Sequence, residues 1–113
     1  MGLPAAVARW YEEPMLILAG TIRLAPGSRD AAKPALTAMV EASRAEPGCL
    51  AYALSFDVED DHLVHVFEAF EDEEALATHR GSAHMAAWRD ARAQLGISER
   101  NMREYFVSAY RQI

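Results

Sequence analysis

The chain has little of what marks several large classes of protein. Its 113 residues contain one cysteine, Cys49, so no disulfide forms within the chain, and a reducing compartment fits best. Only 11 residues are Lys or Arg, against 17 Asp and Glu, and the basic residues are scattered rather than gathered in a stripe. The resulting net charge of -6 repels phosphate backbones, so we expect no nucleic-acid partner.

Long apolar runs are missing as well. The longest one, residues 15–22, is far shorter than the roughly 20 residues that cross a bilayer as a helix. The first 13 residues contain Arg9, Trp10 and two glutamates where a signal peptide needs an apolar core. We therefore expect no membrane partner, no secretory leader and, by elimination, a cytoplasmic location.

Length and composition predict one domain with an ordinary core. The apolar fraction is 51% and the charged fraction is 25%, which is the usual balance of a globular protein. We predict that residues 14–113 form this domain. Residues 1–13 show no clear period, and we expect them to form an extension or a short helix.

Hydrophobic periodicity predicts four strands and two helices along this domain. In chain order they are a strand over 15–24, a helix from Ser28 or Asp30 to Ala45, a strand over 49–56, a strand over 62–70, a helix over 73–81 that continues after a break from Ser82 to Leu95, and a strand over 101–110. Asp72 and Ser82 are expected to cap the two parts of the broken helix. Pro34 lacks a backbone donor, so we expect an irregular first turn in the first helix.

The order β-α-β-β-α-β predicts an α+β fold of the ferredoxin-like type. Right-handed crossovers place both helices on one face of a four-stranded antiparallel sheet. A sheet whose second face is wet alternates apolar and polar residues. The strands over 15–24, 62–70 and 101–110 are instead apolar on both sides. We therefore predict a homodimer, in which a second copy covers the other face.

Short motifs within residues 15–110 match the pattern of a known family. They are Pro26-Gly27 before the first helix, Glu46-Pro47-Gly48-Cys49 with Tyr52 after it, the run Glu68-Ala69-Phe70-Glu71-Asp72-Glu73-Glu74-Ala75-Leu76, and then His79, Ser82 and His84. With these motifs the chain resembles the antibiotic biosynthesis monooxygenase domain family of dimeric α+β barrels. The resemblance implies a homodimer whose two sheets form a barrel, with a pocket between each sheet and its helices.

The resemblance also implies an activity. Some members oxidise quinols or polycyclic phenols with molecular oxygen and use no metal, flavin or haem, so we expect no cofactor. The substrate supplies the electrons, while the protein binds a flat ring, excludes water and helps to remove a phenolic proton. Other members degrade haem with a strand tryptophan and an asparagine on the first strand. This chain has Phe70 in place of the tryptophan and no asparagine over 15–24, so we do not expect haem degradation.

Three residues are candidates for proton transfer. His79 shares a helix side with Leu76 and could take a proton from a bound phenol, or it could be a helix-end histidine bonded to a carbonyl or to Glu68. His84 lies in the first turn after Ser82, where the helix dipole favours a neutral imidazole, and a surface or capping role is the alternative. Glu68 lies on an apolar strand face. It could accept a proton, or it could hold His79 or a helix N-terminus in place, which is the role we favour.

Aromatic and methionine side chains at core spacing are predicted to line a pocket for a small aromatic or apolar ligand. They are Met39, Tyr52, Phe56, Phe70, Met85 and Trp88. Packing as ordinary core is the alternative for each of them.

The sequence predicts no metal site. His62 and His65 lie three apart on a strand and point to opposite faces. His79 and His84 lie on either side of the helix break, and no third ligand is found at a usable spacing.

Two other functions stay open. Because the family's tryptophan and asparagine are missing, the chain could be a non-catalytic dimeric barrel that binds a small apolar ligand in a stress or regulatory role. It could also catalyse an isomerase or lyase reaction on a dicarbonyl or a lactone, since similar barrels use similar histidines.

Overall fold

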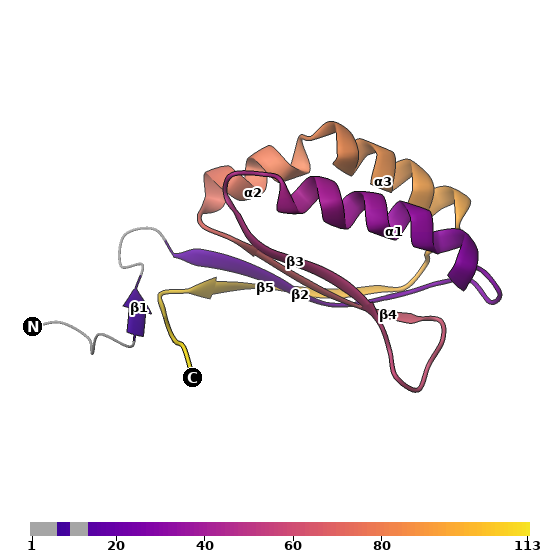
Figure 1. Ribbon diagram of the computed structural model, residues 1–113, viewed down its shortest axis with the longest axis horizontal. Coiled ribbons are helices and arrows are strands. Elements are labelled where there is room, and N and C mark those ends of the chain that lie inside the picture. The colour runs from indigo at the N-terminus through magenta and orange to yellow at the C-terminus, as the bar shows by residue number, and fades with distance from the viewer. Residues whose placement is uncertain (1–6, 10–13) are drawn as a thin grey trace, which may run out of the picture.

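The computed structural model of the protein describes residues 7–9 and 14–113. Its main body has two layers, an antiparallel sheet and the helices that lie across one face of it (Figure 1). In spatial order the strands of the sheet are β3 (Cys49–Phe56), β4 (Leu63–Phe70), β2 (Met15–Arg23) and β5 (Arg100–Val107), and the helices are α1 (Arg29–Arg44), α2 (Glu73–Arg80) and α3 (Ala83–Gln94). In this described part, the predicted ferredoxin-like α+β fold with its broken second helix is confirmed.

Strand pairing decides which side chains face the helices. Leu18 of β2 lies opposite Glu68 of β4 and Glu104 of β5, and Leu16 lies opposite Phe70. Leu16 and Phe70 are fully buried, and the even-numbered residues of β4 from 64 to 70 are all buried. Glu68 therefore lies on an apolar, helix-covered face, as the alternation predicts.

The predicted caps hold the broken helix in place. Asp72 accepts a hydrogen bond from the backbone N–H of Ala75 at 2.8 Å, and Ser82 accepts one from Met85 at 3.2 Å. The Ser82 hydroxyl also donates to the carbonyl of His79 at 2.7 Å. Ser82 thus ties the end of α2 to the start of α3, because one side chain bonds to both.

The expected irregular first turn of α1 is wrong. The helix begins at Arg29, and the Ala32 N–H already donates to the Ser28 carbonyl at 2.8 Å. Pro34 is the sixth residue of the helix rather than part of its first turn. Pro34 and Asp30 are both exposed, so the carbonyl that loses its helical donor lies on the water-facing side.

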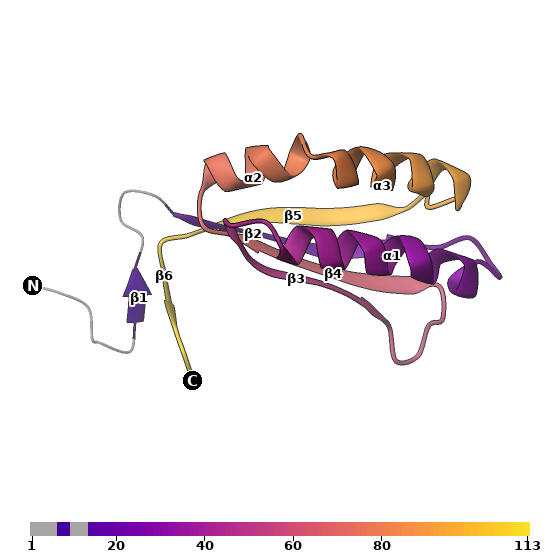
Figure 2. The ribbon, with the colours of Figure 1, turned by 45° about the horizontal axis from the view of Figure 1, so that its top comes forward.

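The last predicted strand, 101–110, is also corrected. β5 ends at Val107, and after a bend the chain forms a short strand, β6 (Ala109–Arg111), which pairs with β1 (Val7–Arg9) and not with the main sheet. This ribbon stands beyond the end of the sheet (Figure 2). Alternation continues through both strands, so the sequence does not reveal the change of partner. Of the predicted extension or short helix over 1–13, residues 7–9 are a strand and the rest lies outside the described residues.

The second face of the sheet carries exposed aromatic rings. Phe67 is 42% exposed and Tyr105 is 46% exposed, and both belong to the odd-numbered set that points away from the helices. In Figure 1 the helices of the described part all lie over the opposite face. None of these helices is long and apolar enough to cross a bilayer.

Candidate functional site

His79 is the most enclosed polar side chain at the centre of the candidate site. It lies in the last turn of α2 and is 2% exposed. Its ring packs against those of Tyr52 and Phe70, with centroid distances of 5.5 Å and 4.9 Å. The prediction that His79 faces inward is therefore correct, and two neighbouring rings restrict its orientation.

Glu46 bonds to this histidine and is missing from the residues that the sequence singled out for the site. It lies in the turn between α1 and β3, and its carboxylate oxygens are 3.0 Å and 2.8 Å from Nδ1 of His79. The sequence shows Glu46 only as part of the motif Glu46-Pro47-Gly48-Cys49, without a role of its own. Nothing local distinguishes it, because 33 residues separate it from His79.

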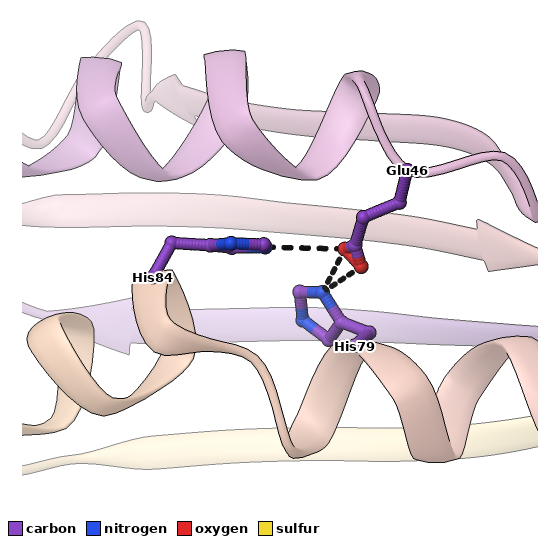
Figure 3. A group of neighbouring side chains, drawn as sticks. All are labelled: Glu46, His79 and His84. Atoms are coloured by element: carbon purple, nitrogen blue, oxygen red, sulfur yellow. Dashed lines mark hydrogen bonds and ion pairs between the residues drawn. The ribbon is translucent and has the colours of Figure 1, made fainter.

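His84 reaches the same carboxylate from the other side of the helix break. Its Nε2 lies 3.1 Å from Oε2 of Glu46, and its ring centroid is 5.8 Å from that of His79 (Figure 3). The side chains of His79, Glu46 and His84 are 2%, 12% and 24% exposed, respectively. The cluster thus runs from the interior to the surface, with the carboxylate between two imidazoles.

Glu68 lies on the inner side of His79. Its Oε1 is 3.7 Å from Nε2 of His79, which is too long for a hydrogen bond. Burial raises the pKa of Glu68 to about 7, while the charges of Arg100 and Arg80 oppose this shift and the charge of Glu46 adds to it. His84, Glu46, His79 and Glu68 therefore form a row of four ionisable side chains.

The hydrogen bond to Glu46 decides which nitrogen of a neutral His79 is the acceptor. A carboxylate accepts, so Nδ1 carries the proton and donates it to Glu46. The lone pair of Nε2 then faces Glu68. In this form His79 can take up a second proton from the inner side of the site.

A small cavity adjoins Glu68 between the sheet and α3. Its volume is about 30 Å³, which holds one or two water molecules. Tyr52, Met85 and Trp88 line it, as do Arg92 and Arg100 at its edge. Burial raises the pKa of the Tyr52 hydroxyl, and the charge of Glu68 adds to this effect, so Tyr52 stays protonated as a donor.

The structure places the six predicted pocket residues in three different surroundings. Tyr52, Met85 and Trp88 line the cavity. Met39 and Phe70 are 2% and 0% exposed and belong to the closed core. Phe56 lines a different groove, along α1, where the guanidinium of Arg29 lies 4.0 Å from its ring centre.

Fold and site together define a ferredoxin-like α+β protein with a buried carboxylate–imidazole cluster under its helices. The family model of the antibiotic biosynthesis monooxygenases matches residues 15–91, which include Glu46, Glu68, His79 and His84. Because this match covers more than half of the chain, the protein belongs to the antibiotic biosynthesis monooxygenase family.

Solved structures agree with this assignment. PA3566 from Pseudomonas aeruginosa is 32% identical with a TM-score of 0.74, over 86% of this chain and 96% of that one. The structure of Rv0793 from Mycobacterium tuberculosis is 30% identical with a TM-score of 0.64, over 88% and 95% of the two chains. A protein from Deinococcus radiodurans has a TM-score of 0.79 at 22% identity, over 87% and 97%, and this likeness supports the fold alone.

A sequence relative carries the description "Putative monooxygenase Rv0793", from Mycobacterium tuberculosis. It is 39% identical over 71 residues, which cover 63% of this chain and 66% of the relative. The match thus spans just under two thirds of the relative's length.

Proposed function

We propose that this protein is a monooxygenase that oxidises a quinol or a polycyclic phenol with molecular oxygen, without metal, flavin or haem, and that it works as a homodimer. Membership of the antibiotic biosynthesis monooxygenase family supports the reaction class. The observation that carries the proposal is the position of Glu68, a carboxylate 8% exposed at the wall of a cavity between sheet and helices.

The surroundings of Glu68 suit the removal of a phenolic proton. A ring in an enlarged form of this cavity would contact Tyr52, Met85 and Trp88, which are aromatic or polarisable. Its hydroxyl could give its proton to Glu68, with His79 directly behind at 3.7 Å. Glu46 holds His79 in the orientation that keeps Nε2 toward Glu68. We therefore assign Glu68 as the proton acceptor and His79 and His84 as further members of the proton path. Glu46 positions His79 and links the two histidines.

The reaction balances without a cofactor. A phenol that loses its proton becomes an electron-rich anion, which can transfer electrons to oxygen. One oxygen atom then bonds to a ring carbon, and the other leaves as water with two hydrogens from the substrate. Phenol and oxygen together thus yield a quinone and water, and the substrate supplies all of the electrons. The protein excludes bulk water and accepts the first proton.

The homodimer part of the proposal depends on the second face of the sheet. Phe67 and Tyr105 leave large apolar rings in water there, whereas Ala69 beside them is 4% exposed. The partners of Phe67 on the flanking strands, Ala19 and Ala53, are small and apolar. Such a face suits a second copy of the same sheet.

Oxygen uptake by the metal-free protein tests the activity. Protein treated with a chelator is mixed anaerobically with each of a panel of hydroquinones and polycyclic phenols, and oxygen is then added. We expect faster oxygen uptake than in buffer for at least one compound, and a fall of roughly 100-fold in Glu68→Gln. Glu41→Gln, an exposed glutamate on α1, is the matched control and keeps the rate. Equal rates in buffer and protein for every compound would refute the proposal.

The replacement of the family's tryptophan by Phe70, which is fully buried in the closed core, favours a second candidate, a non-catalytic barrel that binds a small apolar ligand. Either candidate requires the cavity of about 30 Å³ to enlarge, because ligand pockets usually have a few hundred Å³. Calorimetry with the same panel under anaerobic conditions separates the two. Binding of a phenol without any oxygen uptake supports the barrel, whereas loss of turnover in His84→Ala at an unchanged melting temperature supports the enzyme.

A further inference from the structure

We propose that Glu46, His79 and His84 bind one divalent transition-metal ion of the zinc type. Among the residues that the structure describes, these three form a group whose ligand atoms all lie within 4.8 Å of one another. The inference does not rest on the proposed oxygenase, because it concerns binding in the absence of substrate.

The spacings from the Glu46 carboxylate to the two imidazoles are close to what such an ion requires. Zinc binds nitrogen and carboxylate oxygen at about 2.0–2.2 Å in a tetrahedron, so neighbouring ligand atoms lie about 3.3–3.5 Å apart. Oε2 of Glu46 lies 2.8 Å from Nδ1 of His79 and 3.1 Å from Nε2 of His84. Displacements of a few tenths of an ångström would bring both of these pairs to the spacing of a tetrahedral site. The two histidine nitrogens lie within 4.8 Å of each other and complete the group. Figure 3 shows the three side chains converging from the turn after α1 and from both sides of the helix break.

The site has the exposure of a metal centre with one open position. His79 is buried, while the side chain of His84 is 24% exposed. Three protein ligands leave the fourth corner of the tetrahedron for water on the side of His84. Glu46 also lines a groove of about 280 Å³, together with Glu71, Asp72 and Glu74. Their negative charges would raise the local concentration of cations near Glu46.

Glu68 would support the metal from behind. A metal on Nδ1 of His79 leaves the proton on Nε2, and Oε1 of Glu68 lies 3.7 Å from that nitrogen. A carboxylate behind a metal-bound histidine is the common outer partner of such sites, since it fixes the tautomer and the ring orientation. The rings of Tyr52 and Phe70 both pack against the same histidine.

The sequence predicted no metal site because no third ligand was found near His79 and His84, and the proposal corrects this point. His79 and His84 do have a third ligand, but it comes from 33 residues before His79. The proposal also has a consequence for the oxygenase. A metal on Nδ1 leaves Nε2 protonated, so His79 could no longer take a proton, and the ion would act as an inhibitor.

The test is a zinc titration of the full chain after chelator treatment, in competition with a chromophoric chelator. We expect one zinc ion per chain and a decrease in zinc affinity of more than 100-fold in His84→Ala. The loss of a residue that only hydrogen-bonds a metal ligand lowers metal affinity by about 10–100-fold, and the loss of a ligand itself should lower it further. His65→Ala is the matched control, since His65 is an exposed histidine that bonds Asp57 and not Glu46. Cobalt in place of zinc should give the intense visible absorption of a tetrahedral site.

Two results would overturn the proposal. One is binding of less than one zinc ion per chain by the wild type. The other is equal affinity in wild type, His84→Ala and His65→Ala, which would place the ion elsewhere. Glu46→Gln adds a second ligand variant, and circular dichroism shows whether it folds. Oxygen uptake is not part of this test. The zinc site can therefore be refuted while the proposed oxygenase stands, and the oxygenase can be refuted while the zinc site stands.

Discussion

The two faces of the sheet differ in how far a single chain shields their side chains from water. On the helix-covered face, Glu68 and His79 are 8% and 2% exposed, and Glu46 from the same chain partners the histidine. On the other face, Phe67 and Tyr105 remain 42% and 46% exposed. One chain therefore encloses the inner end of its polar cluster, at Glu68 and His79, but leaves an apolar face open. We expect the enclosure of these two residues to need only one chain, and the covering of the open face to need a second copy.

The largest effect is expected from a charge on the open face. Phe67→Glu places a carboxylate at the centre of the proposed interface, and we expect the dimer to weaken by at least about 100-fold. Sedimentation velocity at micromolar concentration measures this. Ala87→Glu, on the exposed surface of α3, is the control and should leave the dimer intact. A wild-type protein that sediments only as single chains would contradict the prediction that a second copy covers the open face.

The next largest effect is expected on the enclosed face. His79→Ala removes the hydrogen bond from His79 to Glu46, which keeps only His84, and leaves a void beside the rings of Tyr52 and Phe70. We expect this to lower the free energy of unfolding by about 3 kcal/mol. Chemical denaturation of the metal-free protein measures the change. His65→Ala removes an exposed histidine and should change it by only about 0.5 kcal/mol. A loss below about 1 kcal/mol in His79→Ala would mean that the cluster is not enclosed in solution.

The pH dependence of stability should come partly from Glu68. Burial raises the pKa of its carboxyl from 4.5 in the unfolded chain to about 7 in the folded one. Between these two pKa values the folded state holds a proton that the unfolded state releases. The contribution of Glu68 to the free energy of unfolding is therefore complete below pH 4.5 and is lost as the pH rises to about 7. We expect a loss of about 2–3 kcal/mol over this range, relative to Glu68→Gln. The measurement is the free energy of unfolding of metal-free wild type and metal-free Glu68→Gln from pH 4.5 to 8. If both changed equally with pH, the pKa shift of Glu68 would be absent.

The smallest effect is expected at the helix break. Ser82→Ala removes the bond to the Met85 N–H and the bond to the His79 carbonyl, and we expect a loss of about 1 kcal/mol. Asp72→Ala removes the cap of α2 and is the comparison for an ordinary cap. If Ser82 also positions His84, zinc affinity falls in Ser82→Ala but not in Asp72→Ala. Equal affinity in both would limit Ser82 to capping.

Most of the fold could be predicted because it depends on local pattern. Alternation identified the four strands of the main sheet to within one or two residues, except at the end of the last one. It did not identify β1, with which β6 pairs. Asp72 and Ser82 are caps whose side chains act within three residues, so their role is visible in the sequence. Pro34 misled us because a proline also fits within a helix where the lost bond faces water.

The candidate site could be predicted only in part. His79, His84 and Glu68 could be chosen because their elements and faces follow from periodicity. Glu46 could not, since its partners are distant in sequence and a glutamate in a turn is ordinary. The cavity volume depends on how side chains of β3, β4 and α3 pack together, and no single segment carries that information.

The most direct test of the proposed oxygenase is the fate of the oxygen atoms. Metal-free protein is supplied with ¹⁸O₂ and with a phenol of the panel that it oxidises, and the mass of the product is measured by mass spectrometry. The account predicts one heavy oxygen atom in each product molecule with the wild type, and little product with Glu68→Gln. A product formed equally fast without protein, or one that carries no heavy oxygen, would contradict it.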